Sequence, residues 1–215
     1  TSMTWTACGP TARKWSGKTV KQSEVFEGDK RMSQDFTAYH VVTERPMALG
    51  QMIHLDETWE SGVYRRVMEK LPMVEQIYNA PKSWEGKELE HHTMVALREL
   101  ALEEVRQERY PDKPSRLHCL YVSESLKEAK QWAEFFIGLG RPTYQIVKLQ
   151  ISGRRFVGNA NLCFDATSDR EYNREMAQRY WQIFPVPTGE PPIWEILVDG
   201  EIQVEKIVEE IGKNL

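Results

Sequence analysis

The chain has 215 residues, of which 40% are hydrophobic and 28% charged, a composition typical of a soluble globular protein with one domain. Its cysteines, Cys8, Cys119 and Cys163, have no paired spacing, which argues against a disulfide framework and favours a reducing compartment. A net charge of −4 gives no global electrostatic case for a nucleic-acid partner. No window approaches the roughly 18 apolar residues of a membrane span, and no signal peptide is recognised, so we expect a cytoplasmic protein.

Residues 1–35 are expected to form an irregular basic arm, ahead of a folded domain over residues 36–215. The first 23 residues carry four basic side chains and no acidic one, together with Trp5 and Trp15. Such a segment can contact a phosphate backbone. A solvated arm is the more common outcome for a terminal segment of this kind.

The first half of the domain reads as two short strands and two helices. β-rich runs predict strands at residues 37–42 and 51–55. Apolar residues at helical spacing predict a helix over residues 64–77, which Pro72 is expected to break or kink. The next helix spans residues 89–109, with its apolar residues on one face and Arg98, Glu103, Arg106 and other charged residues on the rest.

The second half alternates strands and helices. A strand at residues 117–122 is followed by Ser123, interpreted as the N-cap of a helix over residues 124–136. Strands are predicted at 144–151 and 156–157, a helix at 169–181, a loop at 184–192, and strands at 193–198 and 202–207 around a turn at 199–200. This order predicts an α+β domain and is compatible with two small antiparallel sheets that frame a cleft, with helices on the flanks.

Three polar residues interrupt otherwise apolar strands: His40, Tyr121 and Glu195. Taken singly, each is more often structural, since strand alternation can point a glutamate into water and an isolated strand histidine is usually a satisfied core or edge group. An unpaired carboxylate that faced the core beside Trp194 and Ile196 would be costly. The combination of the three is therefore more informative than any one of them.

Three elements of the chain together resemble the H-Y-E branch of ADP-ribosyltransferases. They are a strand with Tyr39 and His40, a strand with Tyr121 that leads into a helix with Trp132, and a late strand with Glu195. This branch includes diphtheria toxin and the poly-ADP-ribose polymerases. The interval of 11 positions between Tyr121 and Trp132 matches the two aromatic residues of its second motif, although the family normally has Tyr at the second position. Locally, the chain is similar over residues 37–210 to a little-characterised bacterial family assigned to this group.

The resemblance implies a catalytic site that uses NAD as substrate and no metal. Glu195 would stabilise the oxocarbenium-like state that forms when nicotinamide leaves its ribose. His40 would hydrogen-bond the adenosine ribose, the backbone near Val41 would hold the nicotinamide amide, and Tyr121 and Trp132 would stack on its ring. Ser123 has two interpretations, a ribose contact and a helix cap, of which the cap is slightly favoured.

The acceptor is less defined. Arginine-modifying relatives carry Gln or Glu two positions before the catalytic Glu, whereas this chain has Ile193, so arginine on a protein is not expected. Together with the basic arm, this slightly favours RNA or DNA over protein. Bacterial enzymes of this kind often act as toxins in toxin–antitoxin or antiphage systems, which implies an antitoxin partner.

Other interpretations are weaker. His91 and His92 are adjacent on a helix and do not converge on one metal ion, and Cys119 in an apolar strand indicates an inert thiol rather than a nucleophile. The main alternative is a non-catalytic α+β module whose aromatic residues bind a nucleotide or a macromolecular partner.

Overall fold

The computed structural model describes residues 34–185 and 191–211. The expected basic arm lies outside these residues, apart from its last two positions. The expected loop at 184–192 falls outside them at residues 186–190.

The described chain forms four α-helices, two short 3₁₀ helices and seven strands, all strand pairs being antiparallel. In chain order they are β1 (Gln34–Val42), β2 (Met52–Leu55), α1 (Gly62–Asn79), η1 (Pro81–Ser83), α2 (His91–Arg109), β3 (Leu120–Val122), α3 (Leu126–Gly138), β4 (Gln145–Gly153), β5 (Arg155–Asn159), η2 (Ala160–Leu162), α4 (Arg170–Trp181), β6 (Trp194–Val198) and β7 (Gly200–Glu210). The expected α+β class with two antiparallel sheets is confirmed.

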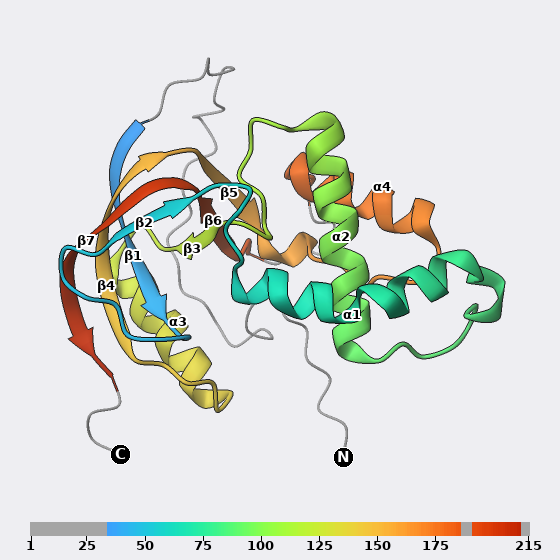
Figure 1. Ribbon diagram of the computed structural model, residues 1–215, viewed down its shortest axis with the longest axis horizontal. Coiled ribbons are helices and arrows are strands. Elements are labelled where there is room, and N and C mark those ends of the chain that lie inside the picture. Colours follow the sequence, from blue (N-terminus) through green and yellow to red (C-terminus); the bar gives the residue numbers. More distant parts are fainter. Residues whose placement is uncertain (1–33, 186–190, 212–215) are drawn as a thin grey trace.

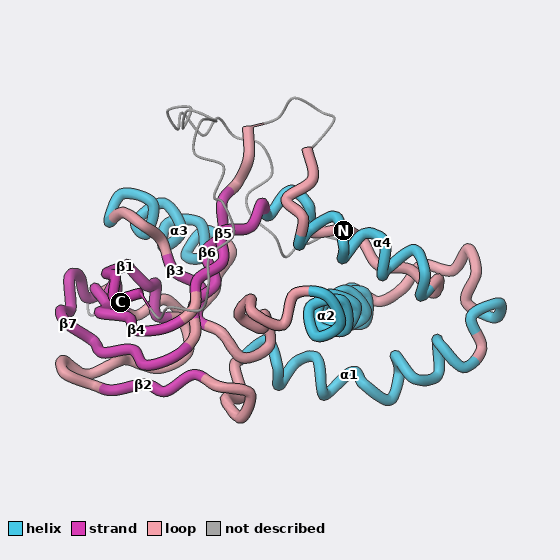
Figure 2. The backbone as a smooth tube through the Cα atoms, turned by 90° about the horizontal axis from the view of Figure 1, so that it is seen from above, coloured by secondary structure: helices cyan, strands magenta, loops and turns pink. Residues whose placement is uncertain are grey.

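The strands and most of the helices lie on opposite sides of the molecule. A four-stranded sheet has the order β1-β4-β7-β2, and a three-stranded sheet has the order β3-β6-β5. Helices α1, α2 and α4 gather on one side, whereas α3 packs against β1 and β4 among the strands (Figures 1 and 2). The turn after β6, where Gly200 has φ +97°, leads from the smaller sheet into the larger one, so β6 and β7 do not form a hairpin.

Three apolar cores hold this arrangement together. The largest lies among α1, α2 and α4 and reaches Phe156 and Leu197 of the smaller sheet. A second joins the two sheets, and a third, around Ala129 and Ala133, fixes α3 on β1 and β4. Both sheets and all four helices are therefore tied into one packed body.

Helix α2 is more buried than its sequence pattern indicates. Arg98, Glu103 and Arg106, which the pattern assigned to a polar outer face, are 1%, 7% and 3% exposed. The assignment is wrong because α1 and α4 pack on two sides of α2 and the segment before β3 covers another. These charges are tolerated because each is paired and hydrogen-bonded.

Pro72 does not break α1, and Ser123 does not cap α3. Helix α1 continues through Pro72, which is exposed, while Val67, Val74 and Ile77 are buried and pack in the helical core. Packing on both sides of the proline offsets a cost of about 3 kcal/mol. Helix α3 is capped by Ser125 and not by Ser123, since Ser125 and Glu128 form a reciprocal capping box.

Candidate functional site

A cleft of about 1700 Å³ opens between the strands β1, β3 and β6 and the helices α1, α2 and α3. Its lining includes every residue that the sequence assigned to the site: His40, Val41, Tyr121, Ser123, Trp132 and Glu195. Residues from positions 40 to 195 thus face one space.

The strands that carry His40, Tyr121 and Glu195 are consecutive neighbours. Tyr39 of β1 exchanges two backbone hydrogen bonds with Ser123, at N···O distances of 2.9 and 2.8 Å, which connects β1 to the end of β3. β3 then pairs along its length with β6. The backbone of Ser123 is thus part of the connection between the two sheets, and its side chain lies at the cleft.

The hydrogen bonding of His40 fixes which ring nitrogen carries its proton. Nδ1 lies 2.8 Å from the carbonyl oxygen of Tyr121. A carbonyl oxygen can only accept, so Nδ1 donates and Nε2 of the neutral ring is an acceptor. Burial lowers the pKa of His40 below its usual 6.5 and keeps the ring neutral near pH 7. His40 therefore presents a hydrogen-bond acceptor suited to a sugar hydroxyl.

The backbone of Val41 points towards the cleft edge of β1. Residues two apart on an antiparallel strand direct their N–H and C=O groups to the same side. Because Tyr39 uses these groups to bond Ser123, those of Val41 point away from β4, in the same direction. A flat amide lying along this edge could both donate to and accept from the strand.

Aromatic side chains line two parts of the cleft. Trp132 lies on α3 with its ring centroid 5.8 Å from that of Phe135 and 5.7 Å from that of Phe136. Tyr121 lies on β3, with the guanidinium of Arg116 5.5 Å from its ring centroid. Burial raises the pKa of Tyr121 well above 10, so its ring stays neutral and apolar.

Glu195 is almost buried and is held by side chains from two other segments. Its side chain is 10% exposed and forms an ion pair with Arg116, which precedes β3 and is 4% exposed. The hydroxyl of Tyr180 on α4 donates a 2.7 Å hydrogen bond to Oε1 of Glu195. Arg116 also donates to the Tyr180 oxygen at 2.7 Å, which leaves the hydroxyl proton directed at the carboxylate.

Arg116 connects Glu195 to a second buried carboxylate on α2. Its Nε donates to Oε2 of Glu99 at 2.8 Å, and Arg98 lies 3.3 Å from the same carboxylate. Burial alone would lower the pKa of Arg116, but the charges of Glu195 and Glu99 outweigh it and hold that pKa well above its usual value. Two guanidinium groups and two carboxylates therefore balance at the base of the cleft.

No sequence pattern marks Arg116, Tyr180 or Glu99 as site residues. Tyr180 fits the apolar pattern of α4, and Glu99 reads as one more charge on a helix rich in charges. Arg116 lies 79 positions from Glu195, and no local spacing connects them. These residues come together only through the pairing of the strands and the packing of α4 against them.

Side chains typical of metal or nucleophile sites are not assembled at the cleft. Within residues 34–185 and 191–211, no group of three His, Cys, Asp or Glu side chains could hold a metal ion. Cys119 is buried, which raises the pKa of its thiol well above 9. A thiol in this state is a poor nucleophile.

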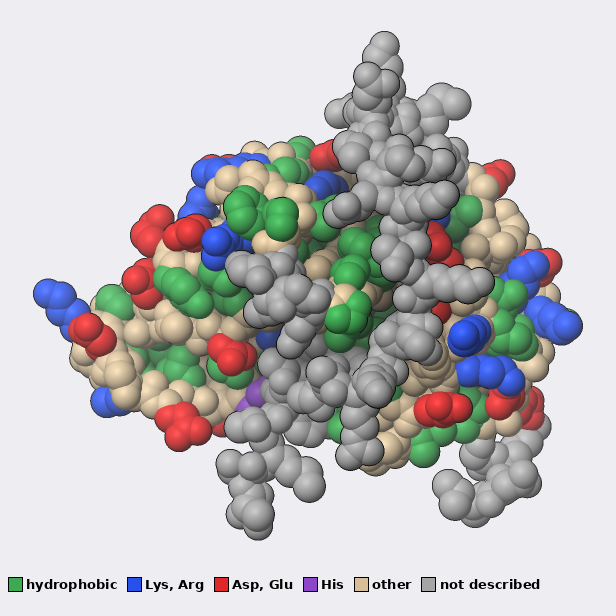
Figure 3. Space-filling model, turned by 180° about the vertical axis from the view of Figure 1, so that it is seen from behind, with side chains coloured by type: hydrophobic (Ala, Val, Ile, Leu, Met, Phe, Trp, Pro, Cys, Tyr) green, Lys and Arg blue, Asp and Glu red, His purple; other side chains and the backbone are tan. Residues whose placement is uncertain are grey.

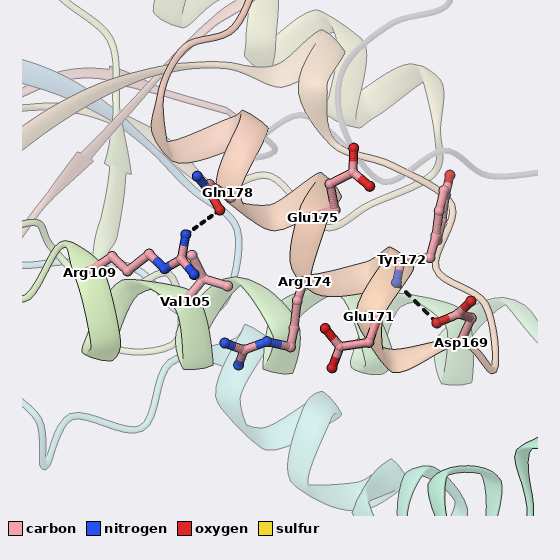
Figure 4. Close-up of a pocket in the computed structure, with 8 residues that line it drawn as sticks. All are labelled: Val105, Arg109, Asp169, Glu171, Tyr172, Arg174, Glu175 and Gln178. Carbon is pink, nitrogen blue, oxygen red and sulfur yellow. Dashed lines mark hydrogen bonds between the residues drawn. The ribbon is translucent and has the colours of Figure 1, made fainter.

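A smaller hollow of about 570 Å³ lies between α2 and α4, away from these residues. Figure 4 shows its lining, in which Arg109 donates to Gln178 and Asp169 caps the start of α4 at Tyr172. Arg174 of this hollow pairs with Glu104 and Glu108. Its two arginines, Arg109 and Arg174, are thus held by neighbouring side chains.

The chain matches the family described as "Protein of unknown function (DUF2441)" over residues 38–210. It belongs to that family. The match begins in β1 and ends at the last residue of β7, so it covers both sheets and all four helices. The chain matches no curated protein sequence.

Two further properties concern the distribution of surface charge and the apolarity of the helices. Acidic and basic side chains are interspersed over the described parts of the face in Figure 3. Among the described helices, none has the length and apolarity needed to cross a membrane.

Proposed function

We propose that this protein is an NAD-dependent ADP-ribosyltransferase of the H-Y-E type, with Glu195 at its reactive centre. The observation that carries the proposal is the meeting of three separate strands, β1, β3 and β6, with His40, Tyr121 and Glu195 all lining one cleft. A set of strand residues with unrelated structural roles would have no reason to converge in this way.

The individual groups fit the chemistry of NAD. The neutral acceptor at Nε2 of His40 suits the hydroxyls of the adenosine ribose. The backbone edge at Val41 suits the nicotinamide amide, and the rings of Tyr121 and Trp132 suit the flat nicotinamide. Ser123, which does not cap α3, lines the same cleft and is proposed as a ribose contact.

The reaction separates nicotinamide from its ribose. The bond between the nicotinamide nitrogen and C1′ of the ribose breaks, and its electron pair leaves with nicotinamide as a neutral molecule. Positive charge then develops on the ribose, where the carboxylate of Glu195 stabilises it and orients the sugar through a hydroxyl. The acceptor attacks C1′ and releases a proton, which balances the transfer.

For the acceptor, we propose nucleic acid over protein. Ile193 occupies the position where arginine-modifying relatives carry Gln or Glu. On the same resemblance, a role as a toxin controlled by an antitoxin is part of the proposal. The acceptor would be recognised at the cleft mouth or by the basic arm, whose first 23 residues carry four basic side chains and no acidic one.

The test uses purified protein, NAD labelled in its adenylate part, and a cell lysate. We expect label to enter macromolecules with the native chain, and nuclease but not protease to release it. Glu195→Gln should transfer no label. Glu201→Gln, the same substitution at an exposed position on β7, is the matched control and should transfer as the native chain does.

Three outcomes would change the proposal. Label released only by protease would make protein the acceptor. Label transfer by Glu195→Gln at the native rate would remove Glu195 from the reaction. Tight NAD binding without label transfer or nicotinamide release would favour a binding module.

A further inference from the structure

The two oxygens of the Glu195 carboxylate have different surroundings. The contacts from Arg116, Tyr180 and the Cys163 thiol all go to Oε1. Oε2 accepts no hydrogen bond from any residue that the structure describes. No buried side-chain nitrogen or oxygen in the described chain lacks a partner, so Oε2 is not buried. Because Glu195 lines the cleft, Oε2 is reached from that cleft.

Tyr180 contacts Oε1 from the protein interior and not from the cleft. It is 0% exposed and is not part of the cleft lining, so it contacts the carboxylate from the protein interior. Burial raises the pKa of its hydroxyl well above 10, so the group remains a hydrogen-bond donor at neutral pH. A donor in this position can orient Glu195 but cannot touch a molecule in the cleft.

Gly158 makes room for that approach. It lies on β5 directly opposite Glu195 of β6, and a Cβ atom there would be 2.6 Å from the Tyr180 hydroxyl oxygen and 3.0 Å from Cζ. Separations under about 3 Å are too close for a carbon and another heavy atom. The absence of a side chain at this position therefore lets α4 bring its hydroxyl to the carboxylate.

We propose that Arg116 and Tyr180 are positioning residues that fix Oε1 of Glu195 and thereby reserve Oε2 for a ribose hydroxyl of NAD. The proposal rests on the function proposed above. An unanchored carboxylate could rotate about its terminal bond, and its hydrogen bond to the hydroxyl would be lost in part of the population. Arg116 also pairs with Glu99 of α2, so the guanidinium that holds Oε1 is itself fixed on its other side.

The experiment measures nicotinamide release from NAD by Tyr180→Phe, Gly158→Ala and the double variant. Tyr180→Phe keeps the buried ring and removes the hydroxyl, which donates to Glu195 and accepts from Arg116. We expect kcat to fall on the order of 10- to 100-fold while KM for NAD changes less than about twofold, because the carboxylate is misplaced and the binding surfaces are not. Gly158→Ala should lower kcat in the same way by displacing the hydroxyl.

The double variant separates positioning from general damage. If Gly158→Ala acts through the hydroxyl, the double variant should be no slower than Tyr180→Phe alone. Multiplied losses in kcat would overturn the proposal. The matched control is Tyr78→Phe, which removes a hydroxyl bonded to Asn173 and should leave kcat unchanged. Thermal unfolding of each variant verifies that the chain is folded during the assay.

Failure of this inference differs from failure of the proposed function. Native kcat in folded Tyr180→Phe, with an active native chain, would overturn the positioning role and leave the function standing. A loss confined to KM would also overturn it, because the hydroxyl would then serve binding. A native chain that releases no nicotinamide from NAD would overturn both.

Discussion

Two buried carboxylates, Glu103 and Glu195, are held by arginines within the same domain, and their surroundings differ in one respect. Both oxygens of Glu103 are occupied: Oε1 accepts from Arg106 and Gln107 at 2.8 and 2.9 Å, and Oε2 accepts from Arg106 and Ser115 at 3.0 and 2.7 Å. Glu195 has its contacts on Oε1 alone and faces a cleft with Oε2.

The difference separates a structural cluster from one that is open to a ligand. The Glu103 cluster fixes the segment before β3 onto α2, since Ser115 and the carbonyl of Lys113 belong to that segment. Its hydrogen-bonding capacity is used within the protein. The Glu195 cluster also pairs a carboxylate with an arginine but keeps one acceptor atom at the cleft. Burial and charge pairing are common to both, and only the unused acceptor distinguishes them.

The strongest test of this comparison removes the charge of each carboxylate in turn. Glu195→Gln should lower nicotinamide release on the order of 10³-fold, because the amide cannot stabilise a developing positive charge, while NAD binding persists. Glu103→Gln should instead destabilise the fold by about 3 kcal/mol, because Arg106 loses its buried partner. Calorimetry should show a melting temperature lower by roughly 6–12 °C.

The comparison would fail if the effects were exchanged or shared. If Glu103→Gln stayed folded but no longer released nicotinamide from NAD, catalysis would depend on the Glu103 cluster, contrary to the comparison. Unfolding of Glu195→Gln would make Glu195 a structural residue like Glu103. Far-UV circular dichroism at the assay temperature distinguishes these cases.

A smaller effect is expected at the aromatic wall of the cleft. Trp132→Ala should weaken NAD binding about tenfold, because stacking of a base on an aromatic ring contributes roughly 1–3 kcal/mol. Titration calorimetry in a Glu195→Gln background measures this without turnover. Trp132→Tyr, which restores the ring usual in the resembled family, should retain most of the affinity. Unchanged binding by the alanine variant would exclude stacking at this position.

The smallest effect concerns the protonation of His40. Its pKa is depressed by burial, so the unfolded chain takes up the proton first, and the stability contributed by the neutral ring is lost as pH falls below 6.5. Protonation also removes the Nε2 acceptor. NAD affinity should be constant above pH 6.5 and fall about fivefold once the ring is charged, which corresponds to one hydrogen bond.

Calorimetry between about pH 8 and about pH 5 tests the role of His40. In a His40→Asn variant the affinity should be lower and its pH dependence weaker. A His40 pKa above 6.5, measured by NMR, would contradict the buried neutral ring. An increase in affinity on acidification would indicate that the ring acts as a donor to NAD instead.

Much of the secondary structure could be predicted from the sequence. β1, β2, β4, β5, β6 and β7, and the helices α1 to α4, lie where apolar periodicity indicated. Two errors are decided by packing and hydrogen bonding. Pro72 remains helical because α1 is packed both before and after the proline, and Ser125 replaces Ser123 as the cap because the backbone of Ser123 bonds Tyr39. The strand predicted from residue 117 begins only at Leu120.

The sequence by itself determined the α+β class and placed His40, Tyr121 and Glu195 on separate strands, because such patterns repeat within a few residues along the chain. Only the tertiary structure decided that β1, β3 and β6 are neighbours and that Arg116 and Tyr180 hold Oε1 of Glu195. These contacts join residues far apart in the chain. Their formation depends on strand pairing and helix packing, which short-range periodicity does not specify.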